Sequence, residues 1–97
     1  MPIFDLEFLP SARKEWDKLD KSVRNQFAKK IAERLVAPRI ASARLSGMAD
    51  CYKIKLRSAG YRLVYRVEDQ RVTVVLIAVG QRDRNAAYKA TAKLVGD

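Results

Sequence analysis

Two stretches of alternation, at residues 51–57 and 61–67, constrain the fold of this chain more than any other feature. The first, CYKIKLR, alternates apolar and cationic side chains, and the second, YRLVYRV, alternates again after a turn-like segment at residues 57–60. A period of two is the pattern of a strand with one buried face. A four-residue loop at 57–60 would join the two strands into an antiparallel hairpin whose apolar faces lie together.

The register of this hairpin sets cations against one another. Counting outward from the loop places Lys55 directly opposite Arg62, with Lys53 one step along the same face. The other face pairs apolar and aromatic side chains: Leu56 with Tyr61, Ile54 with Leu63 and Tyr52 with Tyr65. Like charges directly across a ladder destabilise it by a few tenths of a kcal/mol up to about 1. Folding alone gives no reason to accept this cost, so we interpret the cationic face as a site for a polyanion.

The overall charge indicates the same class of partner. The chain has 20 Lys and Arg against 11 Asp and Glu, a net charge of +9 on 97 residues. Such a balance favours nucleic acid, an anionic membrane or an acidic protein. No segment approaches the roughly 18 consecutive apolar residues of a membrane span, and no signal-like segment opens the sequence, so we expect no membrane partner. The single cysteine, Cys51, fits a reducing cytoplasm, where we expect the protein to act.

The amino-terminal half predicts a strand followed by two helices. Residues 3–8 alternate as a first strand. A short helix opens at Pro10, and a second has Asp20 as its N-cap and stops before Pro38. Apolar residues recur at helical spacing, as expected of faces that pack on a sheet: Ala12, Trp16 and Leu19 in the first helix, and Val23, Phe27, Ile31 and Leu35 in the second. The strand would turn one face to the core, with Phe4, Leu6 and Phe8.

The carboxy-terminal half predicts a central strand and a last helix. After a turn at 68–71, residues 72–79 are nearly all apolar, as in a strand covered on both faces. Val75 and Ile77 would form an apolar floor beside the cations, and the alanine-rich segment 85–94 would be helical. The order β-α-α-β-β-β-α predicts a single α+β domain over residues 1–97, a small antiparallel sheet with a helical pair packed on one face.

Residues 50–65, DCYKIKLRSAGYRLVY, resemble the core of the RelE toxins of bacterial toxin–antitoxin systems, within the RelE/ParE superfamily. Residues 79–88 resemble the end of the last strand and the start of the final helix in that family. The resemblance implies the same α+β fold and cleavage of messenger RNA in the ribosomal A site, which inhibits translation. It implies as partners a cognate antitoxin, the ribosome with its small-subunit RNA, and messenger RNA. The chain departs from several relatives at Ser46, where they carry an arginine.

The resemblance also implies the site residues and the reaction. The positions that match the family's catalytic residues are Lys53, Lys55, Arg62, Arg82 and Tyr88. Similar proteins use the RNA 2′-hydroxyl as nucleophile on the adjacent phosphate and leave a 2′,3′-cyclic phosphate, with no metal and no cofactor. The sequence offers no His and Cys ligand cluster that would suggest a metal site.

The absence of histidine limits how this site can work. A lysine is a base only when neutral, and with a pKa near 10.4 fewer than about one in a thousand are neutral at pH 7. Neighbouring cations and burial lower the pKa of a lysine, so Lys55 beside Lys53 and Arg62 is the candidate base. In a second interpretation, Lys53 and Arg62 supply most of the catalysis by stabilising the phosphorane, at about 3 to 4 kcal/mol per donor. Arg82 would assist the leaving group, and Tyr88 would stack on a base or orient the 2′-hydroxyl.

Two other functions remain open from the sequence. The first is a non-enzymatic inhibitor of DNA gyrase, similar to the ParE toxins, and the second is a basic RNA-binding module with salt-sensitive binding and no strand scission. The full set of five matched residues favours the endoribonuclease. The cations of the second helix are expected to form a solvated face or a secondary phosphate contact: Lys21, Arg24, Lys29, Lys30 and Arg34. The antitoxin is expected to be an acidic, partly disordered segment that folds over the cations and the floor of Val75 and Ile77.

Overall fold

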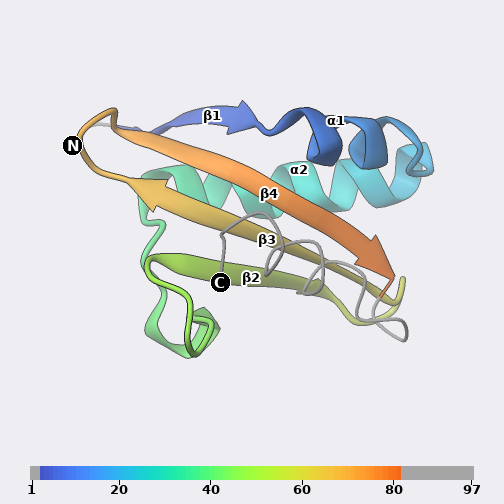
Figure 1. Cartoon of the computed structure of the whole chain (residues 1–97). Helices are drawn as coiled ribbons and strands as arrows, with labels where there is room; N and C mark the ends of the chain where they lie inside the picture. Colours follow the sequence, from blue (N-terminus) through green and yellow to red (C-terminus); the bar gives the residue numbers. More distant parts are fainter. Residues whose placement is uncertain (1–2, 82–97) are drawn as a thin grey trace.

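The computed structural model of the chain describes residues 3–81 and shows two helices on one side of a four-stranded sheet (Figure 1). Its elements in chain order are β1 (Asp5–Phe8), α1 (Pro10–Asp17), α2 (Lys21–Val36), a short 3-10 helix η1 (Ala41–Ala43), β2 (Cys51–Leu56), β3 (Tyr61–Glu68) and β4 (Thr73–Gln81). The strand order in the sheet is β1-β4-β3-β2. The α+β prediction is therefore confirmed, while the helix expected at 85–94 lies outside the described residues.

The sheet is mixed. The strands β2, β3 and β4 form the antiparallel meander that the sequence predicts, but β1 joins β4 in parallel, with Leu6 opposite Val74. Parallel neighbours need a long crossover, and the segment that holds α1, α2, β2 and β3 supplies it. Alternation along a strand shows which face is buried, but it carries no information on which strand lies beside it or in which direction that strand runs. The sequence pattern therefore did not predict this pairing.

The β2–β3 hairpin has the predicted register. Lys55 pairs with Arg62 and Leu56 with Tyr61, so the loop comprises residues 57–60. The N–H of Gly60 donates to the carbonyl of Leu56 over 2.8 Å, and Gly60 has a φ of +72°. Glycine is the residue that adopts this left-handed conformation without strain, so the loop sequence itself fixes the register.

The helices form where the sequence predicts and bury the predicted stripes. The side chains of Ala12, Val23, Phe27 and Ile31 are buried, and Phe27 is fully enclosed. Asp20 stands at the N-cap of α2 as expected, although its side chain makes no capping hydrogen bond. In the described residues, no helix is long and apolar enough to cross a membrane.

An aromatic chain ties β1 and both helices together. The ring centroids of Phe8 and Trp16 are 5.5 Å apart in an edge-on arrangement, and those of Trp16 and Phe27 are 6.2 Å apart. Such pairs stabilise a core beyond the area that they bury. Leu6 differs from the expectation, because its side chain is 38% exposed on the edge strand while Phe4 and Phe8 pack against the core.

The sheet has a second, smaller apolar cluster on the face away from the helices. Its buried members are Cys51, Val64, Ile77 and Ala78, with Leu9, Leu45 and Met48 packed against them. A register shift at Val64 and Tyr65, whose partners are Ala78 and Leu76, leaves Ile77 as an extra residue in β4. Val75 is buried opposite Arg66. Of the apolar floor predicted from Val75 and Ile77, Ile77 belongs to this cluster, whereas Val75 lies across from Arg66 rather than beside Lys55 and Arg62.

Candidate RNA-cleavage site

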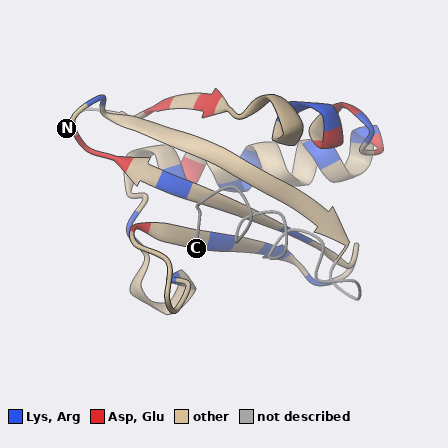
Figure 2. Cartoon of the chain, viewed as in Figure 1, with Lys and Arg blue, Asp and Glu red and all other residues tan. Residues whose placement is uncertain are grey.

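Three cations on one face of the hairpin form the candidate site, which we call the cationic ladder: Lys53, Lys55 and Arg62. The pairing of Lys55 with Arg62 is direct, and Lys53 lies opposite Val64. All three side chains are half-buried. Figure 2 shows the basic segments of β2 at the opposite edge of the sheet from the acidic strand β1. The hairpin register thus concentrates positive charge on one edge of the molecule.

The electrostatics of the ladder act on Lys55. The positive charge of Lys53 is the largest cause that lowers the pKa of Lys55, followed by desolvation and by the charges of Arg62 and Arg57. Like charges disfavour the protonated form because each ammonium raises the energy of the next. A lower pKa increases the neutral fraction of Lys55, which is the form able to accept a proton. The direction expected from the sequence is confirmed, and Arg57 is an additional contributor that the sequence did not single out.

The second apolar cluster lies beside these cations. The buried side chain of Cys51 shares the face of Lys53 on β2, and the buried Val64 is the cross-strand partner of Lys53. Charges act more strongly on one another next to apolar groups than in water. Burial raises the pKa of the Cys51 thiol, which fits a structural residue rather than a nucleophile.

Two of the five predicted site residues, Arg82 and Tyr88, lie outside the described residues. The described chain ends at Gln81, whose partner across the sheet is Tyr61, the neighbour of Arg62. The structure thus brings Lys53, Lys55 and Arg62 together and leaves the other two as sequence predictions. Among the residues from 3 to 81, no group of three or more His, Cys, Asp or Glu side chains is placed to hold a metal.

Arg34 differs from its sequence interpretation. The helical pattern groups it with the solvated cations of α2, but the structure shows it half-buried and hydrogen-bonded to the carbonyl of Lys53 and the hydroxyl of Tyr65. The physical reason is its place three residues after the buried Ile31, at the border of the apolar stripe, where α2 crosses β2 and β3. That position was the one signal available in the sequence.

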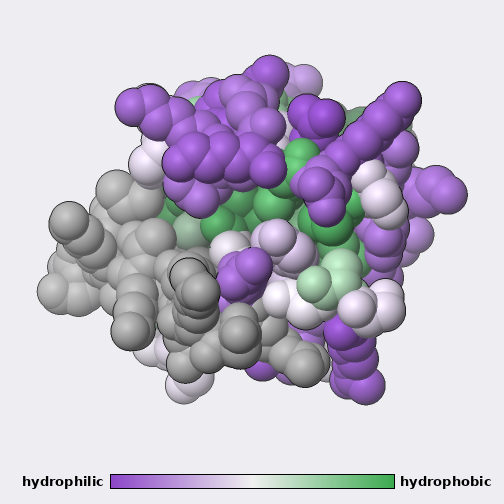
Figure 3. Space-filling view, turned by 90° about the vertical axis from the view of Figure 1, so that its right-hand side faces the viewer, coloured by the Kyte–Doolittle hydropathy of each residue, from purple (hydrophilic) through white to green (hydrophobic). Residues whose placement is uncertain are grey.

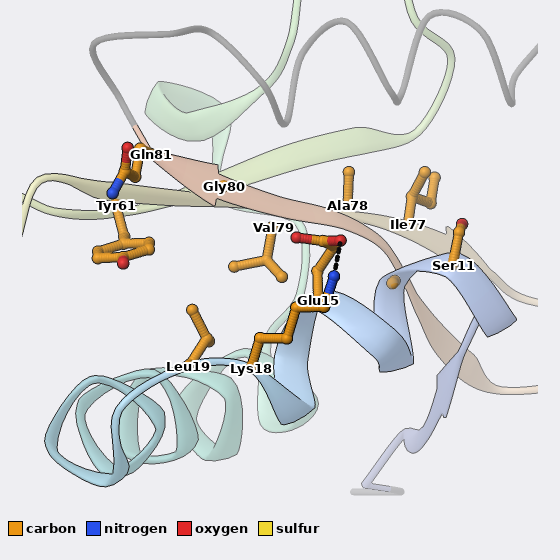
Figure 4. Close-up of a pocket in the computed structure, with 11 residues that line it drawn as sticks. Ser11, Glu15, Lys18, Leu19, Tyr61, Ile77, Ala78, Val79, Gly80 and Gln81 are labelled. Atoms are coloured by element: carbon orange, nitrogen blue, oxygen red, sulfur yellow. Dashed lines mark ion pairs between the residues drawn. The ribbon is translucent and has the colours of Figure 1, made fainter.

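A groove of about 560 Å³ opens between α1 and the end of β4. Figure 3 shows apolar surface in a hollow on this side of the molecule, with hydrophilic side chains above it and to its right. Leu19, Val79 and Tyr61 line it, and an ion pair of 3.6 Å between Glu15 and Lys18 stands at its rim (Figure 4). An apolar hollow with charged borders is suited to receiving apolar side chains of a partner.

Solved structures share this fold. A doubly substituted E. coli RelE toxin in the free state superposes with a TM-score of 0.90 and 47% identity, covering 98% of this chain and 100% of that one. The RelE of the intact E. coli RelBE toxin–antitoxin complex has a TM-score of 0.79 and 55% identity, over 80% of this chain and 95% of that one. The fold is thus that of small bacterial toxins.

Sequence comparison narrows this class. A family model described as the ParE toxin of the type II toxin–antitoxin system parDE matches residues 6–86. The mRNA interferase toxin RelE of E. coli strain K12 is 52% identical over 90 residues, 93% of this chain and 95% of that protein, and the mRNA interferase RelE of Shigella flexneri matches equally well. The chain belongs to the RelE/ParE family of toxins of type II toxin–antitoxin systems.

Proposed function

We propose that this protein is the toxin of a toxin–antitoxin pair and an endoribonuclease that cleaves messenger RNA in the ribosomal A site. The relationship to a protein named mRNA interferase toxin supports the reaction class. The observation that carries the assignment is the cluster of Lys53, Lys55 and Arg62 on one face of the hairpin, where the charge of Lys53 is the largest cause that lowers the pKa of Lys55. In a chain without histidine, this shift enlarges the neutral, proton-accepting fraction of one side chain at the site.

The proposed reaction divides the work among the five site residues. Neutral Lys55 removes the proton of the 2′-hydroxyl, whose oxygen attacks the adjacent phosphorus as the bond to the 5′-oxygen breaks. Lys53 and Arg62 stabilise the charge on the phosphorane oxygens. Arg82 assists the departing 5′-oxygen, which takes up a proton, and Tyr88 stacks on a base or orients the 2′-hydroxyl. The products are a 2′,3′-cyclic phosphate and a 5′-hydroxyl end.

Dependence on the ribosome follows from the small number of catalytic groups at the site. General base catalysis contributes about 10²- to 10⁴-fold. Holding reacting atoms in line contributes far more, up to about 7 to 11 kcal/mol. We infer that the ribosome holds the message bent for in-line attack, because a chain of 97 residues has little surface with which to impose that geometry. This partner also places the proposed action in the cytoplasm.

The proposed antitoxin is an acidic, partly disordered segment that folds over the toxin. A complex of E. coli RelE with its antitoxin is the precedent. Here the cationic ladder offers charge complementarity to an acidic segment, and the groove at Leu19 and Val79 offers a place for its apolar side chains. Titration calorimetry with the product of a neighbouring acidic reading frame is the test. No measurable heat of binding to the folded protein would contradict this partner.

A second candidate function is inhibition of DNA gyrase. The matching family model is described as a ParE toxin, which is the observation in its favour. The purified protein would then block gyrase-dependent supercoiling of plasmid DNA and leave messenger RNA intact. A simple RNA-binding module would do neither and would show only salt-sensitive binding.

Primer extension on a defined message tests the proposed function. The purified protein is incubated with the RNA alone or with programmed ribosomes that have an empty A site. We expect new stops only with ribosomes, lost in Lys55→Ala and Arg82→Ala. The matched control is Lys30→Ala, an exposed lysine of α2 on the other side of the sheet, which should cleave like the wild type. Cleavage by Lys55→Ala at the wild-type rate would overturn the site, and no cleavage by the folded wild type would overturn the function.

A further inference from the structure

The side chain of Arg34 connects the last turn of α2 to strand β2. Its Nη1 donates a hydrogen bond of 3.2 Å to the carbonyl oxygen of Lys53 and one of 2.8 Å to the hydroxyl oxygen of Tyr65. The Tyr65 hydroxyl in turn donates to the carbonyl of Pro38 over 2.6 Å. Arg34 therefore joins the helix, the segment that follows it and the backbone of a ladder residue.

This connection is anchored in the core. Tyr65 is 1% exposed, and its ring is stacked on that of Tyr52 with centroids 5.7 Å apart. The guanidinium carbon of Arg34 lies 5.7 Å from the Tyr65 ring centroid, within the range of a cation–π contact. Charged hydrogen bonds in a half-buried setting are stronger and better oriented than those between exposed side chains. Arg34 is therefore held in one place rather than sampling solvent.

The strand that Arg34 contacts needs support on one side. β2 is at the edge of the sheet, with β3 as its neighbour. The carbonyls of Cys51 and Lys53 both point away from β3: the first accepts from the N–H of Leu45 over 2.9 Å, and the second accepts from Arg34. These contacts replace the hydrogen bonds that a further strand would make, and they do so at the residues that lead into the cationic ladder.

We propose that Arg34 is a positioning residue for the cleavage reaction, which holds the backbone of β2 at Lys53 so that Lys53 and Lys55 keep their spacing. The inference rests on the proposed function of the ladder. Charge interactions weaken as distance grows, and a misplacement of about 1 Å in a catalytic group can cost about 100-fold in rate. When β2 loses its contact with Arg34, the amines of Lys53 and Lys55 separate, and the pKa of Lys55 rises toward its ordinary value.

The test compares Arg34→Met with Arg24→Met. Methionine keeps the length and apolar stem of Arg34 and removes its donors. Arg24 is on the same helix, and in the described part of the chain its side chain shows no hydrogen bond or ion pair, so the second variant controls for the lost charge. The readout is single-turnover cleavage on programmed ribosomes across a range of pH. Arg34→Met should lose about 10-fold in maximal rate with a KM for ribosomes within about 2-fold, and its pH–rate profile should move to higher pH.

Arg24→Met should match the wild type in rate and profile. A wild-type profile and rate in folded Arg34→Met would overturn the positioning role, because a contribution to stability alone does not move a pH profile below the melting temperature. If Arg34→Met does not fold, Arg34→Lys takes its place. The lysine ammonium cannot reproduce the planar guanidinium contact, so an intermediate rate is expected and an unchanged profile would overturn the inference.

Titration of the Lys55 amine by NMR separates this inference from the proposed function. The measurement needs no activity and compares wild type with Arg34→Met. An unchanged Lys55 titration overturns the positioning role even if the wild type cleaves RNA. Failure of the wild type to cleave, with a shifted Lys55 titration in the variant, overturns the proposed function instead.

Discussion

Lys55 lies directly opposite Arg62 in the β2–β3 ladder, so two positive charges meet at a site where most hairpins place complementary side chains. Like charges in this position destabilise the hairpin by up to about 1 kcal/mol. The charge of Lys53 first, then desolvation and the charge of Arg62, lower the pKa of Lys55, and a phosphate bound between the cations would relieve this repulsion. A feature that is unfavourable in the free protein would thus become favourable in complex with the proposed RNA or an acidic partner.

Removal of Lys53 should reduce the neutral, proton-accepting fraction of Lys55. Lys53 is the largest cause of the lowered pKa of Lys55, so Lys53→Met should raise that pKa. Lys55 accepts a proton only when neutral, and at a fixed pH below its pKa a higher pKa reduces the neutral fraction. The pH–rate profile of single-turnover cleavage should therefore move to higher pH. Lys30→Met, on the far side of the sheet, is the control, and an identical profile for both variants would contradict this role of Lys53.

The hairpin could be predicted because three sequence signals agree on it. Alternation in both strands, a four-residue loop and a glycine at its end allow only one register, and Gly60 has the positive φ that this loop requires. Helix α2 was predictable for a similar reason, since its buried stripe is regular and Pro38 ends it. The three ladder residues on the hairpin follow from the same register.

Other features depend on contacts that no local pattern encodes. The parallel pairing of β1 with β4 is set by how the crossover folds back, and Leu6 lies on an exposed edge in spite of its apolar character. The bond of Arg34 to the Lys53 carbonyl joins residues 19 apart in the chain. Local periodicity assigns Arg34 to a helix face, but it does not predict which strand that face contacts.

Glu68 should make the fold sensitive to acid. Arg71 and then Arg66 lower the pKa of Glu68 through hydrogen bonds of 2.7 and 2.9 Å. A carboxyl whose folded pKa is lowered stabilises the fold above its unfolded pKa, about 4.5, and that contribution is lost as the pH falls through the folded pKa. Glu68→Gln should therefore lower stability at pH 7 by less than about 1 kcal/mol and flatten the loss below pH 4.5. Urea unfolding at several pH values measures this, with the exposed Glu33→Gln as control; equal acid sensitivity in both variants would count against it.

Two turn residues should respond in opposite directions to substitution. Val72 has a φ of +48°, a left-handed conformation that is costly for a β-branched side chain. The sequence pattern had predicted that Val72 lies inside the strand. Val72→Asn should stabilise the fold by about 0.5 kcal/mol, because asparagine tolerates this conformation better. Gly60 has open space where a Cβ would stand, so Gly60→Ala should cost about 1 kcal/mol through the backbone alone. Chemical denaturation of both variants measures these changes in stability. A destabilised Val72→Asn would show that the side-chain contacts of Val72 outweigh its backbone strain.

Phe27 should contribute more to stability than the exposed apolar residues of α2. Its side chain is 0% exposed and packs against Trp16. Phe27→Ala leaves a cavity between the helices and the sheet, for which about 3 to 5 kcal/mol is the expected loss. Val36→Ala, at a residue 51% exposed, should change stability by less than about 0.5 kcal/mol. Similar unfolding midpoints for the two variants would contradict the placement of Phe27 in the core.

Replacing Lys55 with arginine should separate proton transfer from electrostatic stabilisation. Arginine keeps the positive charge next to Lys53 and opposite Arg62, but its guanidinium does not lose a proton at any pH that the protein tolerates. If Lys55 is the general base, Lys55→Arg should lose about 100-fold or more in cleavage rate, as much as Lys55→Ala, and raising the pH should restore neither. Binding of Lys55→Arg to programmed ribosomes should remain close to that of the wild type, because the charge is retained. A Lys55→Arg variant that cleaves within a few-fold of the wild type would assign the catalysis to charge alone, with the proton of the 2′-hydroxyl passing directly to solvent.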